Sequence, residues 1–189
     1  MKILLLEGIL LFLHEASLVN KNKVSLTDYL TKFYDRYSKV EPYISAFIQE
    51  DNFKARLTSD ASSLLKKFPD EKPPFFGAPI AIKDLIHVDG FPTLAGSKLP
   101  SNALTSREGS FISNLRSMGA VFVGKTVTEE FAYHSVTPTR NPHNIEHTPG
   151  GPSAGSAASV AAGICPIAVG TQVPTLDNCS CLFLWCGWI

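Results

Sequence analysis

The sequence predicts an α/β fold in which α-helices cover a β-sheet, and three observations support this class. Hydrophobic residues make up 44% of the 189 residues and charged residues 18%, a composition typical of a folded globular protein. Some segments repeat apolar residues at helical spacing, whereas others are short continuous apolar runs. The two patterns alternate along the chain, as they do when helices pack on the faces of a sheet.

The N-terminal segment, residues 1–24, begins with one lysine and a leucine-rich run that resembles a signal peptide. Glu7 interrupts the run, His14 and Glu15 follow it at once, and no small-residue cleavage site is evident. The run is also too short to span a bilayer. We therefore expect a buried or interfacial N-terminal helix and a cytoplasmic protein.

Two amphipathic helices are expected next. Ser25 can cap the first helix with its hydroxyl. Asp28, three residues later in the first turn, can reach back towards Ser25, and its negative charge is favoured there. Pro42 is expected to end this helix. Its apolar face contains Leu26, Tyr29, Leu30, Phe33, Tyr37 and Val40. The second helix is defined by Phe53, Leu57, Leu64, Leu65 and Phe68.

Strands and helices then alternate. Residues 77–84 (Gly-Ala-Pro-Ile-Ala-Ile-Lys-Asp) predict a buried strand that presents Lys83 at its end. Gly119 ends the next helix, because glycine readily adopts the left-handed conformation needed there. The apolar residues of that helix are Phe111, Ile112, Leu115 and Met118. Residues 120–123 predict a strand closed by residues 124–126.

From residue 148 the composition changes to Gly, Ser and Ala. Small side chains allow close approach of backbone to backbone, so a helix at residues 156–162 is expected to pack tightly behind a loop. Residues 164–169 predict one more buried strand.

Charge and ligand patterns exclude several function classes. Seventeen basic residues balance seventeen acidic ones, which argues against a nucleic-acid-binding protein. Cys165 stands alone, and the other cysteines lie within the last eleven residues: Cys179, Cys181 and Cys186. These three lack a fourth zinc ligand. The histidines of the C-terminal half have no regular ligand spacing and are expected in surface loops: His134, His143 and His147. We expect neither a metal nor a cofactor.

Three blocks occur in a fixed order: residues 77–84, residues 119–126 followed by Glu130-Phe131, and residues 141–144 followed by the Gly/Ser/Ala stretch. Together they resemble the amidase-signature family of Ser–cisSer–Lys amide hydrolases. The resemblance runs from about Ser25 to Gln172. It implies a partial amidase-signature domain at residues 25–172. The fold expected there is an amidase-signature-like mixed β-sheet that is covered by α-helices and is incomplete.

The resemblance also implies a mechanism and a substrate class, the C–N bonds of carboxylic amides. A buried neutral lysine is the general base, and a bridging serine in a cis peptide relays the proton. A second serine attacks the carbonyl, and backbone N–H groups stabilise the oxyanion. Lys83 matches the base, Pro152 stands in place of the bridging serine, and Ser153 matches the serine beside it.

The match fails at the expected nucleophile, twenty-four positions after Pro152, which is Leu176 and has no nucleophilic atom. Pro174 stands where a glycine should donate its N–H, and proline has none. Loss of one oxyanion donor costs about 10²–10³-fold in turnover, whereas loss of the nucleophile removes the covalent route. We expect lost or severely reduced activity.

Residues 173–189 form a divergent apolar tail that contains three cysteines and two tryptophans. A truncated, alternatively spliced or frame-shifted product would explain this change in composition. Uncovered apolar surface would then favour self-association.

Alternatives to this interpretation remain open. The chain could be a non-catalytic remnant that binds an amide ligand or a full-length homologue, or a weak amidase that uses Ser153 as a substitute nucleophile. A lysine after an apolar strand is, by itself, most often a solvated strand end, and only the flanking blocks favour catalysis for Lys83. We interpret Lys125 as structural or loop-stabilising.

Overall fold

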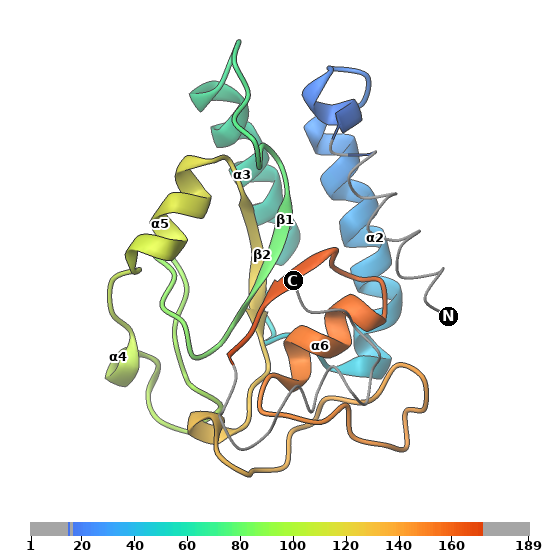
Figure 1. Ribbon diagram of the computed structural model, residues 1–189, viewed down its shortest axis with the longest axis vertical. Helices are drawn as coiled ribbons and strands as arrows, with labels where there is room; N and C mark the ends of the chain where they lie inside the picture. The colour runs from blue at the N-terminus through green and yellow to red at the C-terminus, as the bar shows by residue number, and fades with distance from the viewer. Residues whose placement is uncertain (1–14, 16, 172–189) are drawn as a thin grey trace.

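A parallel sheet lies between helices in the computed structural model, which describes residues 15 and 17–171 (Figure 1). β1 (Pro79–Lys83) occupies the centre of the three-stranded sheet. β2 (Val121–Thr126) and β3 (Ile167–Val169) flank it, and each runs parallel to it. The predicted α/β class, with helices covering a sheet, is confirmed.

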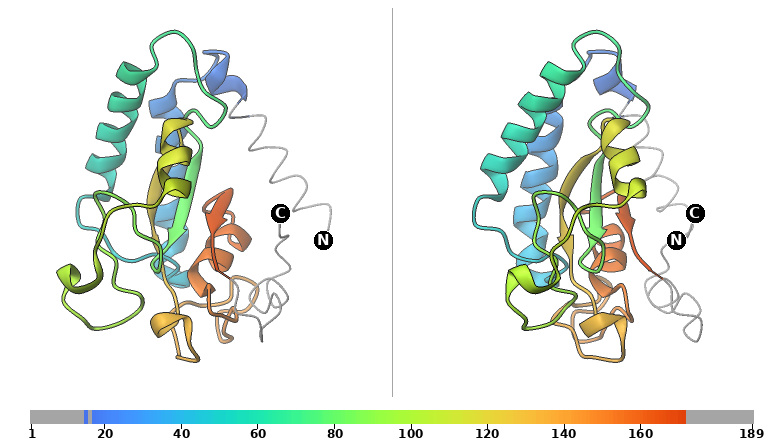
Figure 2. Two further views of the ribbon diagram at one scale, coloured as in Figure 1. Left: turned by 60° about the vertical axis from the view of Figure 1, so that its left-hand side comes forward. Right: turned by 90° about the vertical axis from the view of Figure 1, so that its left-hand side faces the viewer.

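Helices cover both faces of this sheet (Figure 2). α2 (Leu26–Ile44), α3 (Phe53–Lys67) and α6 (Ala154–Ala161) share one apolar core with Ala81 and Val123 of the sheet. α5 (Ser110–Ser117) packs on the opposite face, where a second core contains Ile80 and Ile82. The short helices α4 (Ser101–Leu104) and η1 (Glu130–Ala132) lie in the connecting loops.

The first long helix begins as predicted and ends later than predicted. The Asp28 N–H donates to Ser25 Oγ at 3.0 Å, which confirms the cap. Pro42 does not end the helix, which continues to Ile44. The end is set three residues after Pro42, where Ser45 adopts a left-handed conformation and its N–H donates to the Glu41 carbonyl at 2.8 Å. A proline in the last turn removes only one N–H donor, so the turn persists around it.

A β-bulge lengthens the second strand beyond the prediction. Ile80 pairs with Phe122, but the next residue of β1 pairs with Gly124, so Val123 is an extra residue. Arg56 of α3 donates to the Phe122 and Val123 carbonyls at 3.0 and 3.3 Å. The bulge carries β2 through residues 124–126, which were predicted to close the strand. The third strand is shorter than expected and only half-buried.

The bulge decides which side chains face which core. After it, Lys125 lies beside Ile82 and Thr126 lies beside Lys83 in the pairing register. Thr126 therefore faces α6, where its hydroxyl bonds Ser156 Oγ at 2.6 Å. Lys125 faces the other side of the sheet.

Several expectations fall on residues that the structure does not describe. The N-terminal helix expected in residues 1–24 is described only in part, and residues 17–20 are helical. The tail at residues 173–189, with Pro174 and Leu176, lies outside the described residues. Within the described part, no helix is long and apolar enough to cross a membrane. Residues 15 and 17–171 also contain no group of three or more His, Cys, Asp or Glu side chains arranged to hold a metal ion.

Candidate active site

Lys83 lies at the carboxyl end of the central strand and is fully buried, with 0% of its surface exposed. Its Nζ donates to Ser153 Oγ at 2.9 Å and to Thr171 Oγ1 at 2.6 Å. The two sequence-predicted site residues, Lys83 and Ser153, are therefore in direct contact although seventy positions separate them. A solvated strand end, the alternative interpretation of Lys83, does not fit this burial.

Burial lowers the pKa of Lys83 from its ordinary value of 10.5 to about 8, and the negative charge of Glu129 acts in the opposite direction. The ammonium is disfavoured because it has lost its hydration. A substantial fraction of the amine is therefore unprotonated at mildly alkaline pH. Only the unprotonated amine can accept a proton, so the environment suits a general base.

Ser153 is buried at the start of α6, and its hydroxyl has a full set of hydrogen bonds. It accepts from Lys83 Nζ at 2.9 Å and from the Thr171 N–H at 3.0 Å, and it donates to the Thr171 carbonyl at 3.0 Å. A serine hydroxyl has one proton and two lone pairs, and all three are in use. This arrangement suits a residue that orients the lysine better than one that attacks a substrate.

The Gly151–Pro152 peptide bond is cis. The Pro152 carbonyl accepts from Thr128 Oγ1 at 3.1 Å and from the Glu129 N–H at 3.2 Å. These bonds hold the residue before Ser153 against the segment that follows β2. Proline has no hydroxyl, so Ser153 supplies the hydroxyl that stands beside Lys83 at the start of α6.

Thr171 and Glu129 both act on Lys83, and neither role was predicted from the sequence. Thr171 accepts a hydrogen bond from the Lys83 amine and brackets Ser153 through its own N–H and carbonyl. One oxygen of Glu129, Oε2, is buried and has no hydrogen-bond partner among the described residues. Neither contact follows a local periodicity, so the only sequence signal for Thr171 was its place in the resemblance.

Replacing Glu129 with glutamine is expected to lower the pKa of Lys83 below its value of about 8, because the charge that favours the ammonium is removed. Site-resolved acetylation across a pH series, followed by peptide mass analysis, measures this pKa. Glu130→Gln is the matched control, because Glu130 is exposed and adjacent. An unchanged Lys83 profile in Glu129→Gln would show that the carboxylate does not act on the amine.

Comparisons with known sequences point to one family. A model of the Amidase family matches residues 28–174. A glutamyl-tRNA(Gln) amidotransferase subunit from Sulfurihydrogenibium sp. (strain YO3AOP1) is 37% identical over 167 residues, which is 83% of this chain and 34% of the relative. Its counterpart from Lawsonia intracellularis (strain PHE/MN1-00) is 42% identical over 144 residues, covering 73% of this chain and 29% of the relative. The chain spans about a third of the length of the curated relatives it matches.

Solved structures share the fold. The peptide amidase of Stenotrophomonas maltophilia superposes with a TM-score of 0.70 at 26% identity, covering 82% of this chain and 34% of the enzyme. A 6-aminohexanoate cyclic dimer hydrolase gives a TM-score of 0.69 at 28% identity, covering 83% of this chain and 33% of that enzyme. The same arrangement of sheet and helices therefore occurs within larger hydrolases.

Proposed function

This chain belongs to the amidase family, and on that premise we propose that it carries the general-base part of an amide-hydrolase site, centred on Lys83. The observation that supports the proposal most directly is the contact between the fully buried Lys83 amine and Ser153 Oγ at 2.9 Å. The compounds proposed to occupy such a site are small-molecule carboxylic amides. The relatives' names refer to an amidotransferase, a peptide amidase and a cyclic dimer hydrolase, which are all enzymes of amide chemistry.

The proton movement follows from the hydrogen bonds of Ser153. When Lys83 is unprotonated, its lone pair can accept the Ser153 proton, provided that the hydroxyl turns away from the Thr171 carbonyl. Ser153 then regains a proton from the group that attacks the amide carbonyl. The net result is transfer of one proton from the attacking group to Lys83, which is the work of a general base.

We also propose that this chain hydrolyses amides very slowly or not at all. Leu176 occupies the position where the family pattern has its nucleophilic serine. Pro174 stands where that pattern has a glycine whose N–H stabilises the oxyanion, and proline has no N–H. The saturated hydrogen bonds of Ser153 argue against its use as a substitute nucleophile. A cytoplasmic location and self-association through apolar surface stay predictions from the sequence.

Four measurements test the proposal: the pKa of Lys83, amide turnover, labelling by a serine-reactive probe, and amide binding. Site-resolved acetylation should give Lys83 a pKa of about 8, and an ordinary value near 10.5 would contradict a general base. A panel of aliphatic and aromatic amides should show no turnover, and a serine-reactive fluorophosphonate should not label Ser153. Turnover that disappears in Lys83→Ala would contradict the loss of activity. Saturable amide binding without turnover would instead support the non-catalytic ligand-binding alternative.

A further inference from the structure

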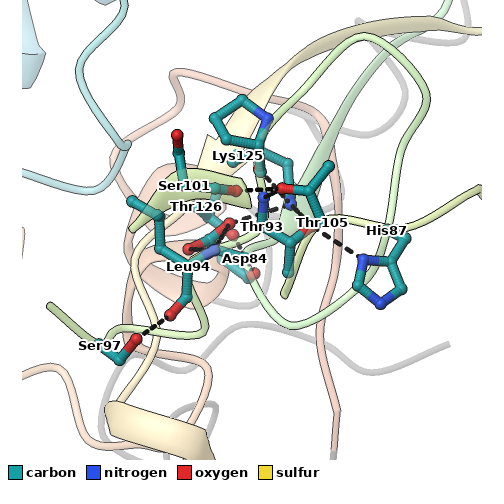
Figure 3. Close-up of polar contacts among 11 residues, drawn as sticks. Asp84, His87, Thr93, Leu94, Ser97, Ser101, Thr105, Lys125 and Thr126 are labelled. Atoms are coloured by element: carbon teal, nitrogen blue, oxygen red, sulfur yellow. Dashed lines mark hydrogen bonds and ion pairs between the residues drawn. The ribbon is translucent and has the colours of Figure 1, made fainter. Parts of the chain in front are cut away.

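A second buried polar cluster lies across the sheet from the Lys83–Ser153 contact and contains an ion pair between Asp84 and Lys125 (Figure 3). The Lys125 Nζ lies 2.9 Å from Asp84 Oδ1, and the two side chains are only 4% and 1% exposed. Asp84 directly follows Lys83 in the chain. Neither Asp84 nor Lys125 takes part in the proposed proton transfer to Lys83.

We propose that the Asp84–Lys125 ion pair is a positioning device that holds the end of β1 so that the Lys83 amine stays against Ser153. This inference rests on the proposed function of Lys83. Asp84 and Lys125 are positioning residues, because neither touches Ser153 and both act through the backbone that carries Lys83.

The backbone of Asp84 is held from both sides. Its N–H donates to the Thr126 carbonyl at 3.0 Å, and its carbonyl accepts from the Ala95 N–H at 2.9 Å. Its carboxylate also accepts from the Leu94 N–H at 3.2 Å. Asp84, the residue after Lys83, is thereby hydrogen-bonded to β2 and to the loop between β1 and α4.

Lys125 closes the same loop from β2. Its Nζ donates to the Pro92 carbonyl and to Thr93 Oγ1, both at 3.1 Å, in addition to its contact with Asp84. Thr93 Oγ1 in turn lies 3.1 Å from His87 Nδ1. Burial lowers the pKa of Lys125, whereas Asp84 raises it. The ammonium thus bonds three separate points around the end of β1.

Stability alone does not account for two buried charges at this place. An apolar pair of similar volume is often as stable as a buried ion pair or more so, because both charges must give up their hydration. A charged pair specifies one geometry, however, since each partner is costly when it is separated. That property matters beside a general base, where a displacement of about 1 Å can reduce the rate about 10²-fold.

The test uses the full chain with Asp84→Asn and Lys125→Met combined, and it measures the pKa of Lys83 by site-resolved acetylation. The double variant removes one charge of each sign, so its direct electrostatic effect on Lys83 nearly cancels. If the pair positions Lys83, the amine leaves its buried place and its pKa rises from about 8 towards 10.5. Urea unfolding of the same samples confirms that the variant is folded during labelling.

Asp84→Asn alone provides a second variant of nearly unchanged shape. Loss of the negative charge, acting only electrostatically, would lower the pKa of Lys83, so a rise indicates displacement. The matched control is Glu108→Gln with Arg116→Met, which removes another ion pair, 2.6 Å long, at α5 on the face of the sheet opposite α6. It should leave the Lys83 profile unchanged.

The outcomes separate this inference from the proposed function. A Lys83 pKa near 8 in the wild type that stays there or falls in both variants would overturn the positioning role and leave the general base intact. An ordinary Lys83 pKa in the wild type would instead overturn the proposed function itself. A rise in either folded variant, with an unchanged control, supports the positioning role.

Discussion

Replacing Gly155 with alanine is expected to destabilise the protein by about 3 kcal/mol or more, because the helix that carries Ser153 at its start is seated on backbone at this position. A Cβ on Gly155 would lie 2.1 Å from the Ala46 carbonyl oxygen and 2.5 Å from the Val127 nitrogen. The Gly155 N–H also donates to the Val127 carbonyl at 2.9 Å. Neither neighbour is the end of a flexible side chain, so α6 itself must move.

Urea unfolding measures this effect, and Gly109→Ala is the control. Gly109 precedes α5 with an ordinary φ of −80°, and no atom lies within 4 Å of a Cβ placed on it. Its replacement should change the free energy of unfolding by less than about 1 kcal/mol. A Gly155→Ala variant as stable as the control would mean that α6 does not rest on the Ala46 and Val127 backbone.

The composition of the sequence predicts that α6 packs closely against neighbouring backbone. It does not predict which backbone segments those are. A run of Gly, Ser and Ala indicates close approach, and the structure buries this helix almost completely. The run does not say which backbone is approached, because Ala46 is more than a hundred positions away. The same limit applies to the contact of Lys83 with Thr171, which joins the ends of two strands.

Local signals explain the elements that were predicted well. The Ser25 cap and the apolar run of β1 are decided within a few residues of sequence, and both are present. The continuation of the helix past Pro42 depends instead on Glu41, whose carboxylate accepts from the Ala46 and Phe47 N–H groups. Those bonds belong to the chain beyond the helix, so a rule based on proline alone misplaces the end.

The bulge in β2 determines on which face of the sheet Lys125 and Thr126 lie, and it is accompanied by a non-local contact. A regular pairing would place every side chain after Val123 on the opposite face. Arg56, which lies sixty-six positions before Phe122, donates hydrogen bonds to the Phe122 and Val123 carbonyls at the bulge. Nothing in the sequence around Lys125 indicates this shift. The buried pair with Asp84 could therefore not be predicted, although the structural interpretation of Lys125 agrees with its position.

Replacing Lys83 with methionine is expected to change how stability depends on pH. The folded-state pKa of Lys83 is about 8 and its ordinary value is 10.5, so between these values the unfolded chain binds a proton that the folded chain does not. Stability therefore rises with pH across this window. As pH falls from 10.5 through 8, this contribution to stability is lost, because the buried amine must then carry a charge. The contribution amounts to about 3 kcal/mol.

The quantity to measure is the difference in free energy of unfolding between wild type and Lys83→Met, by urea titration at several pH values from about 7 to about 10.5. Burial raises the pKa values of Cys165 and Tyr37 to about 12, which costs stability at alkaline pH in both proteins and cancels in the difference. The loss of the Lys83 hydrogen bonds is independent of pH to first order and shifts the whole curve. We expect the stability of wild type relative to the variant to increase by about 3 kcal/mol across this range of pH. A flat difference would show that Lys83 titrates as an ordinary lysine, and the amine would then be too well solvated to act as a base near neutral pH.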